Sequence, residues 1–133
     1  MIQVRSEDRA NGNLAANVLD GDPATFWHTR WQPQFDPPPH ELVIDLGREM
    51  PLRAIGYLPR QDSPNGRVAQ YRFAISNDRT NWTTVAEGRF PSGEARQVVS
   101  LKEPVRTRYL RFVALSELND QNFTSVAEID IVP

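Results

Sequence analysis

The stretch Asn17-Val18-Leu19-Asp20-Gly21-Asp22-Pro23-Ala24-Thr25-Phe26-Trp27-His28-Thr29 is the segment from which the rest of the sequence can be interpreted. Its first half has the composition of a turn, because Gly21 can take a positive φ and Pro23 fixes the exit of the loop. Its second half, Thr25–Thr29, is aromatic and rich in strand-forming residues. The segment therefore predicts an oxygen-rich loop that leads directly into a strand carrying His28.

Around this segment, short runs of alternating residues are separated by 11 prolines and 7 glycines, and no long helical period occurs. This pattern predicts an all-β domain, because strands at such short spacing form antiparallel sandwiches or barrels. The expected strands number about eight: Ile2–Val4, His40–Gly47, Arg53–Leu58, Gln70–Ser76, Trp82–Ala86, Gln97–Leu101, Tyr109–Leu115 and Ala127–Val132.

Length and composition exclude several classes of protein. The 133 residues suit a single domain, residues 1–133, which buries roughly 70% of the surface of its unfolded chain. There is no cysteine, so neither a disulfide framework nor a thiolate site is possible. The net charge of −2 and the absence of basic runs argue against a nucleic-acid surface. No apolar run approaches the roughly 20 residues of a membrane span.

The opening residues Ile2–Arg5 do not have the pattern of a signal peptide. We therefore expect the chain to be a domain cut from a larger secreted multidomain protein.

Four motifs occur in order along nearly the whole chain, and together they resemble a known family. They are Asn17–Asp22 with Thr25–Thr29, Pro39–Gly47, Tyr57–Arg67 and Ala127–Ile131. The chain resembles the discoidin superfamily, also called coagulation factor V/VIII type C domains, and most closely the bacterial carbohydrate-binding modules of family 32. The resemblance implies a jelly-roll, galactose-binding-domain-like β-sandwich with its ligand loops at one end.

The resemblance also implies a structural calcium site in the opening loop. Calcium takes about six to eight oxygen ligands, both carboxylates and carbonyls. The implied ligands are the carbonyls of Asn17, Asp22, Thr25 and Ala127, the hydroxyl of Thr25 and the carboxylates of Asp20 and Glu128. Glu128 and Ala127 would tie the loop to the last strand. The alternative from the local sequence alone is that Asp20–Pro23 is a solvated turn.

For a sugar site, the resemblance implies His28, Arg60 and Arg67, with Asn65 as a further hydrogen-bond partner. Arginine can span vicinal hydroxyls with two donors, and an aromatic ring can pack against the C–H face of a pyranose. The candidate rings are Trp31 and Phe123, of which the sequence slightly favours Phe123 because it lies in a polar segment.

Each of these assignments has a structural alternative. His28 could serve only as a hydrogen-bonded structural histidine, and the two arginines could be paired with Asp62 or Glu41. We expect His40 to be structural, and Trp27 and Trp82 to lie in the core.

The leading functional expectation is a non-catalytic module that targets an attached enzyme to glycans ending in galactose-type sugars (galactose, N-acetylgalactosamine, N-acetyllactosamine or fucose). The protein would be bacterial, secreted or at the cell surface, and monomeric. The alternative is a discoidin domain that binds protein or membrane through Trp31 and Phe123, although no lysine cluster is present for anionic lipid.

An enzyme is not expected. The carboxylates of Asp62, Glu117 and Asp120 lie beside no element that would raise a pKa, and no nucleophile elbow or catalytic metal motif occurs.

Overall fold

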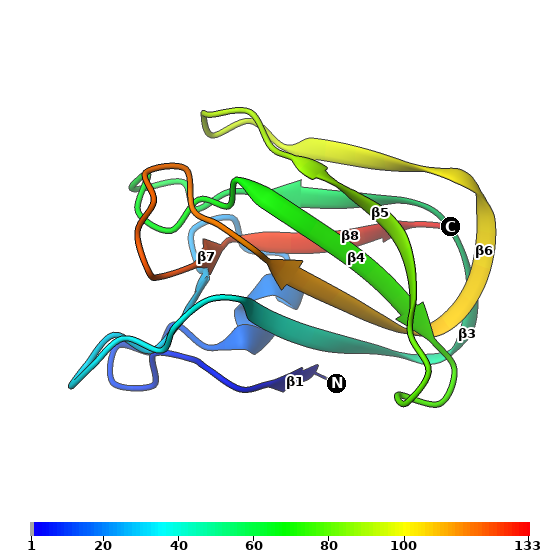
Figure 1. Ribbon diagram of the computed structural model, residues 1–133, viewed down its shortest axis with the longest axis horizontal. Coiled ribbons are helices and arrows are strands. Elements are labelled where there is room, and N and C mark those ends of the chain that lie inside the picture. Colours follow the sequence, from blue (N-terminus) through cyan, green and yellow to red (C-terminus); the bar gives the residue numbers. More distant parts are fainter. Residues whose placement is uncertain (1) are drawn as a thin grey trace.

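The computed structural model describes residues 2–133 as an antiparallel β-sandwich (Figure 1). Its strands are β1 (Ile2–Val4), β2 (Trp27–His28), β3 (His40–Leu58), β4 (Gln70–Ser76), β5 (Thr83–Arg89), β6 (Gln97–Ala114), β7 (Ser125–Val126) and β8 (Glu128–Val132). The all-β prediction is confirmed. A short 3-10 helix, η1 (Ala15–Leu19), was not predicted from the sequence. None of the helical residues in the described part of the chain forms a helix long and apolar enough to cross a membrane.

The two longest strands, β3 and β6, each join two segments that the sequence predicted as separate strands. They pair antiparallel along most of their length, with breaks in register between Asp45 and Met50 and between Leu52 and Ala54. At these breaks both strands turn over, at the right-hand end of Figure 1, so that each contributes to both layers of the sandwich. The predicted strand end at Gly47 is wrong, because its φ of 88° lets the backbone bulge and continue.

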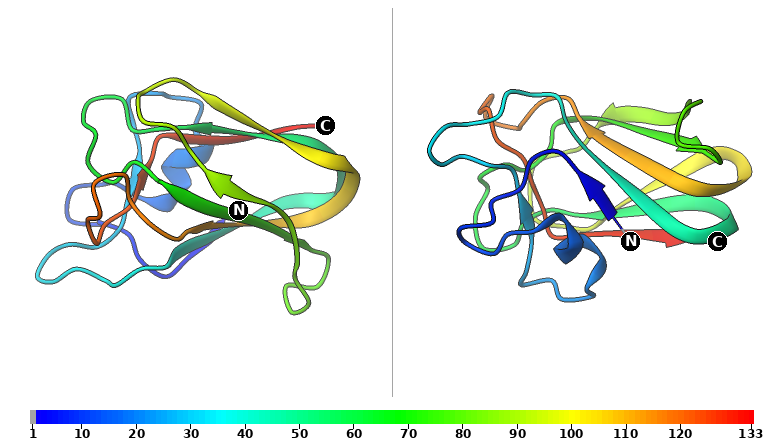
Figure 2. Two further views of the ribbon diagram at one scale, coloured as in Figure 1. Left: turned by 45° about the horizontal axis from the view of Figure 1, so that its top comes forward. Right: turned by 90° about the horizontal axis from the view of Figure 1, so that it is seen from below.

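The two layers follow from this pairing (Figure 2). One layer has the strand order β1-β3-β6-β4-β5. In the other, the second half of β3 pairs with β8, from Ala54↔Val132 to Leu58↔Glu128, and with the first half of β6. The short β2–β7 ladder pairs Trp27 with Val126 and His28 with Ser125.

The core lies between the layers and is aromatic. Trp27, Tyr57, Phe73 and Phe112 are fully buried, and Trp27 Nε1 donates a hydrogen bond to the Ser6 carbonyl at 2.8 Å. This bond satisfies the polar atom of a buried indole. The prediction that Trp27 is a core residue is therefore confirmed.

The same prediction for Trp82 is wrong. This residue precedes β5 and is only half-buried, because the turn between β4 and β5 places it on the outer face of the sheet, where the Arg111 guanidinium lies 4.5 Å from its ring.

Four loops that are far apart in the sequence gather at the left-hand end of Figure 1: residues 5–13, 29–39, 59–67 and 116–124. Backbone hydrogen bonds hold them around the β2–β7 ladder. Asp8 N donates to His28 O at 2.8 Å, and Ser125 N donates to Gly66 O at 2.9 Å. Any ligand site formed by these loops is therefore built on the ladder that carries His28.

Candidate ligand-binding site

A cavity of about 370 Å³ opens between the gathered loops. It is lined by Asp8, Asn11, Asn13, His28, Trp31, Phe35, Arg60, Asn65 and Phe123. The structure thus brings together five of the six side chains that the sequence proposed for sugar binding. We call this the loop cavity.

The histidine in the loop cavity is held as a hydrogen-bond acceptor. His28 is only 7% exposed, and its Nδ1 lies 2.6 Å from the Thr29 carbonyl. A carbonyl can only accept, so Nδ1 carries the proton. Burial, together with the charge of Arg60, lowers the pKa of His28 despite the bond to Thr29, so the ring is neutral at neutral pH. Its Nε2 lone pair is therefore available to accept from a ligand hydroxyl.

The guanidinium of Arg60 is fixed from two sides. Its Nε donates to Asp62 Oδ1 at 2.6 Å, and its Cζ lies 4.1 Å from the centroid of the Phe26 ring. The ion pair with Asp62 that the sequence left open is therefore formed. Since Asp62 accepts from only two of the three guanidinium nitrogens and Arg60 lines the loop cavity, N–H donors remain for a ligand.

Asn65 contributes a second source of donors. Its carbonyl accepts from Ser125 Oγ at 2.6 Å and its backbone N–H donates to Ser63 Oγ at 3.1 Å, which fixes the position of the residue. Its side-chain amide makes no hydrogen bond within residues 2–133. That amide therefore offers two N–H donors and one carbonyl acceptor to a ligand.

Three aromatic rings form the apolar side of the cavity. Phe123 packs between His28 and Phe35, with ring centroids 5.4 and 5.7 Å apart and interplanar angles of 26° and 28°. Trp31 lies edge-on to His28 at 66° and is 37% exposed, and its Nε1 donates to Asp8 Oδ2 at 3.0 Å. Phe123 thus stacks with two other rings, while Trp31 contacts one ring edge-on and is partly exposed, so this packing favours Trp31 as the stacking ring, whereas the sequence favoured Phe123.

Four lining residues were missed by the sequence analysis: Asp8, Asn11, Asn13 and Phe35. Asp8 is 3% exposed and accepts hydrogen bonds from Asn11, Asn13 and Trp31. Burial alone would raise its pKa, but these bonds hold the pKa of Asp8 below the usual value. The turn composition of residues 8–13 was the available signal. Phe35, 46% exposed, could have been noticed as the one aromatic residue in the proline-rich segment.

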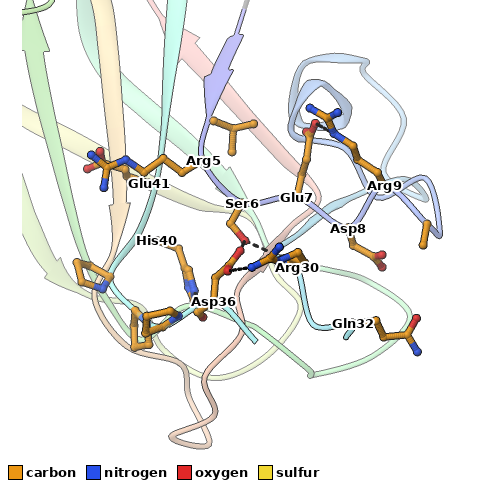
Figure 3. Close-up of a pocket in the computed structure, with 15 residues that line it drawn as sticks. Arg5, Ser6, Glu7, Asp8, Arg9, Arg30, Gln32, Asp36, His40 and Glu41 are labelled. Carbon is orange, nitrogen blue, oxygen red and sulfur yellow. Dashed lines mark hydrogen bonds and ion pairs between the residues drawn. The ribbon is translucent and has the colours of Figure 1, made fainter. Parts of the chain in front are cut away.

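A larger cavity of about 930 Å³ has one lining residue, Asp8, in common with the loop cavity (Figure 3). Three of its polar side chains bind one another. Ser6 Oγ donates to Asp36 Oδ2 at 2.6 Å, and Arg30 Nη2 donates to Asp36 Oδ1 at 2.6 Å. The imidazole of His40 lies between Asp36 O and Thr124 Oγ1, at 2.8 and 2.9 Å, which confirms its predicted structural role. This network fixes the ends of the segment that carries Trp31 and Phe35.

Arg67 is not brought into the loop cavity. Its Nε donates to the Arg60 carbonyl at 3.0 Å, and its side chain lines a separate cavity of about 560 Å³ with Arg89 and Asn119. Both arginines lie at the ends of one loop, as the sequence showed, but their side chains point to different sides of it. The predicted contact of Arg67 with the same sugar as His28 has no support in this arrangement.

Two of the three carboxylates that a catalytic function could use, Glu117 and Asp62, make structural contacts. Glu117 is 2% exposed, and its two oxygens accept backbone N–H groups of Gly66, Asn119 and Gln121. It therefore holds the loop at residues 116–124 against the loop at residues 59–67. Asp62 is paired with Arg60.

The predicted calcium ligands lie together beside η1. Asp20 Oδ2 accepts from Thr25 Oγ1, and the Asp22 carbonyl accepts from Thr25 N and Thr25 Oγ1 at 3.3 and 3.2 Å. Asn17 O accepts from Asp20 N at 3.3 Å. Gly21 has a φ of 74°, as its predicted role in the turn requires. The hard oxygen atoms that calcium prefers are therefore within one loop.

Glu128, at the start of β8, faces this loop. Its Oε1 is buried and has no hydrogen-bond partner within residues 2–133. Burial and the neighbouring Asp20 carboxylate raise its pKa from 4.5 to about 7. Two carboxylates that face each other, one with an unpartnered buried oxygen, fit a divalent cation. Within residues 2–133 no group of three or more His, Cys, Asp or Glu side chains could hold a metal ion, so backbone carbonyls would have to supply the remaining ligands.

We compared the chain with known protein families. The model of the F5/8 type C domain matches residues 2–129. The chain belongs to the F5/8 type C domain family. The resemblance stated from the four motifs is thereby confirmed.

Relatives of this F5/8 type C domain include parts of enzymes. The chain is 41% identical to a region of a sialidase from Micromonospora viridifaciens, an alignment that covers 98% of this chain and 21% of the sialidase. It is 35% identical to a region of a galactose oxidase from Gibberella zeae, covering 96% of this chain and 19% of the oxidase. The chain thus spans about a fifth of the length of these curated relatives.

Solved structures with the same fold include carbohydrate-binding modules of family 32. The module CpGH89CBM32-5 from Clostridium perfringens, in complex with GalNAc-β-1,3-galactose, superimposes with a TM-score of 0.92 at 26% identity, covering 100% of this chain and 94% of that one. The family 32 module of C. perfringens NanJ, in complex with galactose, gives 0.87 at 26% identity, covering 98% and 91%. The predicted jelly-roll sandwich is the fold of these modules.

Proposed function

We propose that this F5/8 type C domain is a non-catalytic carbohydrate-binding module that holds a larger glycan-active enzyme on glycans ending in galactose-type sugars. The observation that carries the proposal is the loop cavity, in which a neutral His28 acceptor, Arg60 and Asn65 donors and aromatic rings face one small space. A pyranose presents hydroxyls on its edges and C–H groups on its faces, which are the complements of these groups.

The sugar would be held by a division of roles. Arg60 would donate to one ring hydroxyl and His28 Nε2 would accept from another, while Asn65 would bind a third at the rim. Trp31 would pack against the C–H face, and its hydrogen bond to Asp8 would keep the ring in place. Such shallow sites have dissociation constants of roughly micromolar to millimolar, so several modules acting together would strengthen attachment.

The galactose-type specificity is supported by the complexes of the two superimposed modules, one with galactose and one with GalNAc-β-1,3-galactose. The role in a larger enzyme is supported by the sialidase and the galactose oxidase that contain similar regions. We extend the proposal to a secreted or cell-surface bacterial protein, in which the module would act as a monomer beside the catalytic domain.

The experiment is a glycan array in calcium buffer, followed by isothermal titration calorimetry with galactose, N-acetylgalactosamine and glucose. Saturable binding of galactose or N-acetylgalactosamine and at least tenfold weaker binding of glucose would support the proposal. Binding that survives in a His28→Phe variant would place the sugar outside the loop cavity. An array without any neutral-sugar signal would contradict the function itself.

We also propose that the loop beside η1 binds a structural calcium ion. The support is the unpartnered buried Oε1 of Glu128 opposite Asp20, with the carbonyl of Asp22 and the hydroxyl of Thr25 nearby. Asn17 and Ala127 would complete the site through their carbonyls. Calcium would neutralise the two facing carboxylates and join the loop to β8. It would take no part in sugar chemistry.

One observation favours a second candidate function, attachment to a membrane surface. Trp31 and Phe35 are 37% and 46% exposed at the same end of the sandwich, as apolar side chains that enter a lipid interface would be. At this end Asp36 and Asp62 are ion-paired with Arg30 and Arg60, which leaves fewer free cations for anionic lipid. Cosedimentation with phosphatidylcholine vesicles, with and without phosphatidylserine, distinguishes the two functions, because a sugar-binding module remains in the supernatant.

A further inference from the structure

A second small cavity, of about 260 Å³, lies on the outer face of the layer that contains β1, β3 and β6. It is lined by Gln3, Val4, Arg5, Glu41, Leu42, Val43, Arg79, Trp82 and Arg111. It shares no residue with the loop cavity. We call it the outer-face cavity. Arg5 and Glu41, which lie at its rim, are labelled on the left of Figure 3.

The outer-face cavity concentrates positive charge on a chain whose net charge is −2. Its three arginines, Arg5, Arg79 and Arg111, face a single carboxylate, Glu41. Seven other arginines of the chain form ion pairs, at distances up to 4.0 Å. Within residues 2–133 none of the three cavity arginines has a carboxylate within that distance, and none donates a side-chain hydrogen bond. Arg79 lies over the Tyr109 ring at 5.2 Å and Arg111 over the Trp82 ring at 4.5 Å, but no carboxylate of the described residues balances the charge of the three arginines.

Arg111 is the central arginine of the outer-face cavity. It lies on β6 opposite Val43 of β3 and Ala74 of β4, so a strand flanks it on each side. The ring of Trp82 covers its guanidinium at 4.5 Å, which fixes the plane of the group. Its Nε is buried and has no hydrogen-bond partner in the described residues. A buried donor without an acceptor is unfavourable, so the site is incomplete without one.

We propose that the outer-face cavity is a binding site for a single oxyanion group, the carboxylate or sulfate of an acidic sugar or the free anion. Arginine binds such groups through two parallel N–H···O bonds, and its planar guanidinium is weakly hydrated. Arg111 supplies the fixed centre, while Arg5, directly after β1, and Arg79, in the turn before Trp82, close over the anion. Because the outer-face cavity is separate from the loop cavity, this proposal does not depend on galactose binding.

The proposal can be tested by substituting Glu41, the one carboxylate of the outer-face cavity. If the cavity binds anions, the negative charge of Glu41 opposes binding, and the conservative variant Glu41→Gln should bind the anion at least threefold more tightly. If instead Glu41 is the natural partner of these arginines in solution, the wild-type chain shows no saturable binding of the anion and Glu41→Gln loses stability.

The experiment is a ¹⁵N NMR titration of the whole chain with sodium sulfate, with sodium chloride added to keep the ionic strength constant. The Trp82 indole and Arg111 Nε–H signals should shift along a saturable curve. The double variant Arg5→Gln/Arg79→Gln should bind at least tenfold more weakly. The matched control is Arg72→Gln, an exposed arginine on β4 that is paired with Glu87. It should bind as the wild type does.

Parallel titrations with glucuronate and glucose identify the source of the group. Glucuronate binding at least tenfold tighter than sulfate indicates a site for acidic sugars, equal binding indicates a general oxyanion site, and glucose should cause no shift. Non-saturable shifts with both anions, or equal affinity in the double variant, would overturn the proposal.

Discussion

At the scale of single residues, Arg60 has both a structural and a proposed binding role. Its side chain is 17% exposed, lies over Phe26 and is paired with Asp62, while its remaining donors line the loop cavity. A residue at the end of a loop would be expected to be dispensable for stability. The contact with Phe26 makes Arg60 contribute to stability, because a cation–π contact adds about 0.5–2 kcal/mol to the free energy of unfolding, depending on burial.

We predict that Arg60→Ala abolishes galactose binding and lowers the free energy of unfolding by about 1–2 kcal/mol. The matched control is Asp62→Ala, which removes the largely exposed partner of the ion pair but keeps the guanidinium over Phe26. It should change stability by less than about 1 kcal/mol and leave affinity within about threefold. Calorimetric titration and urea unfolding measure the two quantities. If both variants bind the sugar as tightly as the wild type does, Arg60 does not contact the sugar.

At the scale of elements, the loop after η1 and strand β8 are joined by the facing carboxylates of Asp20 and Glu128. A cation that binds only the folded state stabilises it by mass action, by about 2.7 kcal/mol at a hundredfold excess over Kd. We predict that calcium raises the Tm by roughly 5–10 °C and that a chelator reverses the shift.

The variants Asp20→Ala and Asp22→Ala provide a matched pair for this prediction. Asp20 would use its carboxylate, whereas Asp22 would use only its backbone carbonyl, and its carboxylate accepts from Ala24 N. The calcium-dependent rise in Tm should therefore disappear in Asp20→Ala and persist in Asp22→Ala. A Tm of the wild-type chain that does not respond to calcium would contradict the calcium proposal.

The loop at residues 59–67 depends on the close approach of Gly66 to β7. A Cβ at Gly66 would lie 2.5 Å from Ser125 N, and the φ of Gly66 is +83°. We predict that Gly66→Ala destabilises the fold, displaces Asn65 and weakens sugar binding by at least tenfold. Gly47 is the control, because its φ of +88° is similar but nothing lies within 4 Å of its Cβ position.

Gly47→Ala should therefore cost only the left-handed backbone strain, about 1–2 kcal/mol, and leave sugar affinity unchanged. Urea unfolding should show that Gly66→Ala is the more destabilising substitution by at least about 1 kcal/mol, because it adds a steric clash to the same strain. If the two variants are equally stable, the approach of Gly66 to Ser125 is not a constraint in solution.

At the scale of the whole molecule, both histidines are buried between packed loops, and burial lowers both pKa values. The unfolded chain takes up protons below about pH 6.5, while the folded chain does so only at lower pH. Each histidine therefore favours folding above that pH, and this contribution is lost as the pH falls through the folded pKa. Glu128 acts with the opposite sign, because its pKa is raised to about 7.

We predict that the difference in unfolding free energy between the wild type and His40→Gln shrinks as the pH falls from about 8 to about 5. The comparison isolates His40, which contacts Thr124 and the carbonyl of Asp36, from the opposing effect of Glu128. Urea unfolding at several pH values measures it. A difference that stays constant or grows in acid would show that His40 is not buried in its neutral form.

Much of the fold could be predicted from the sequence, and the errors of that prediction have physical causes. The alternation of residues indicated most of the strands, but not that β3 and β6 continue through a bend. In β3 the reason is that a glycine with a positive φ, Gly47, ends one strand and bulges another equally well. In β6 the segment between the two predicted strands contains Pro104, a residue that also indicates a strand break. Trp82 was misplaced because an extended run has two faces, and sequence alone does not say which one is covered.

The sequence by itself determined the family, the turn that presents Asp20 and Gly21, and the presence of His28 on a strand. These depend on local backbone preferences and on short-range spacing. Only the tertiary structure decided which loop side chains share a cavity. Hydrogen bonds between loops far apart in the chain, such as Ser125 N to Gly66 O, orient Arg60 and Asn65 toward His28 and turn Arg67 away. The same long-range packing brings Asp8 and Phe35 into the site and collects three arginines on the outer face.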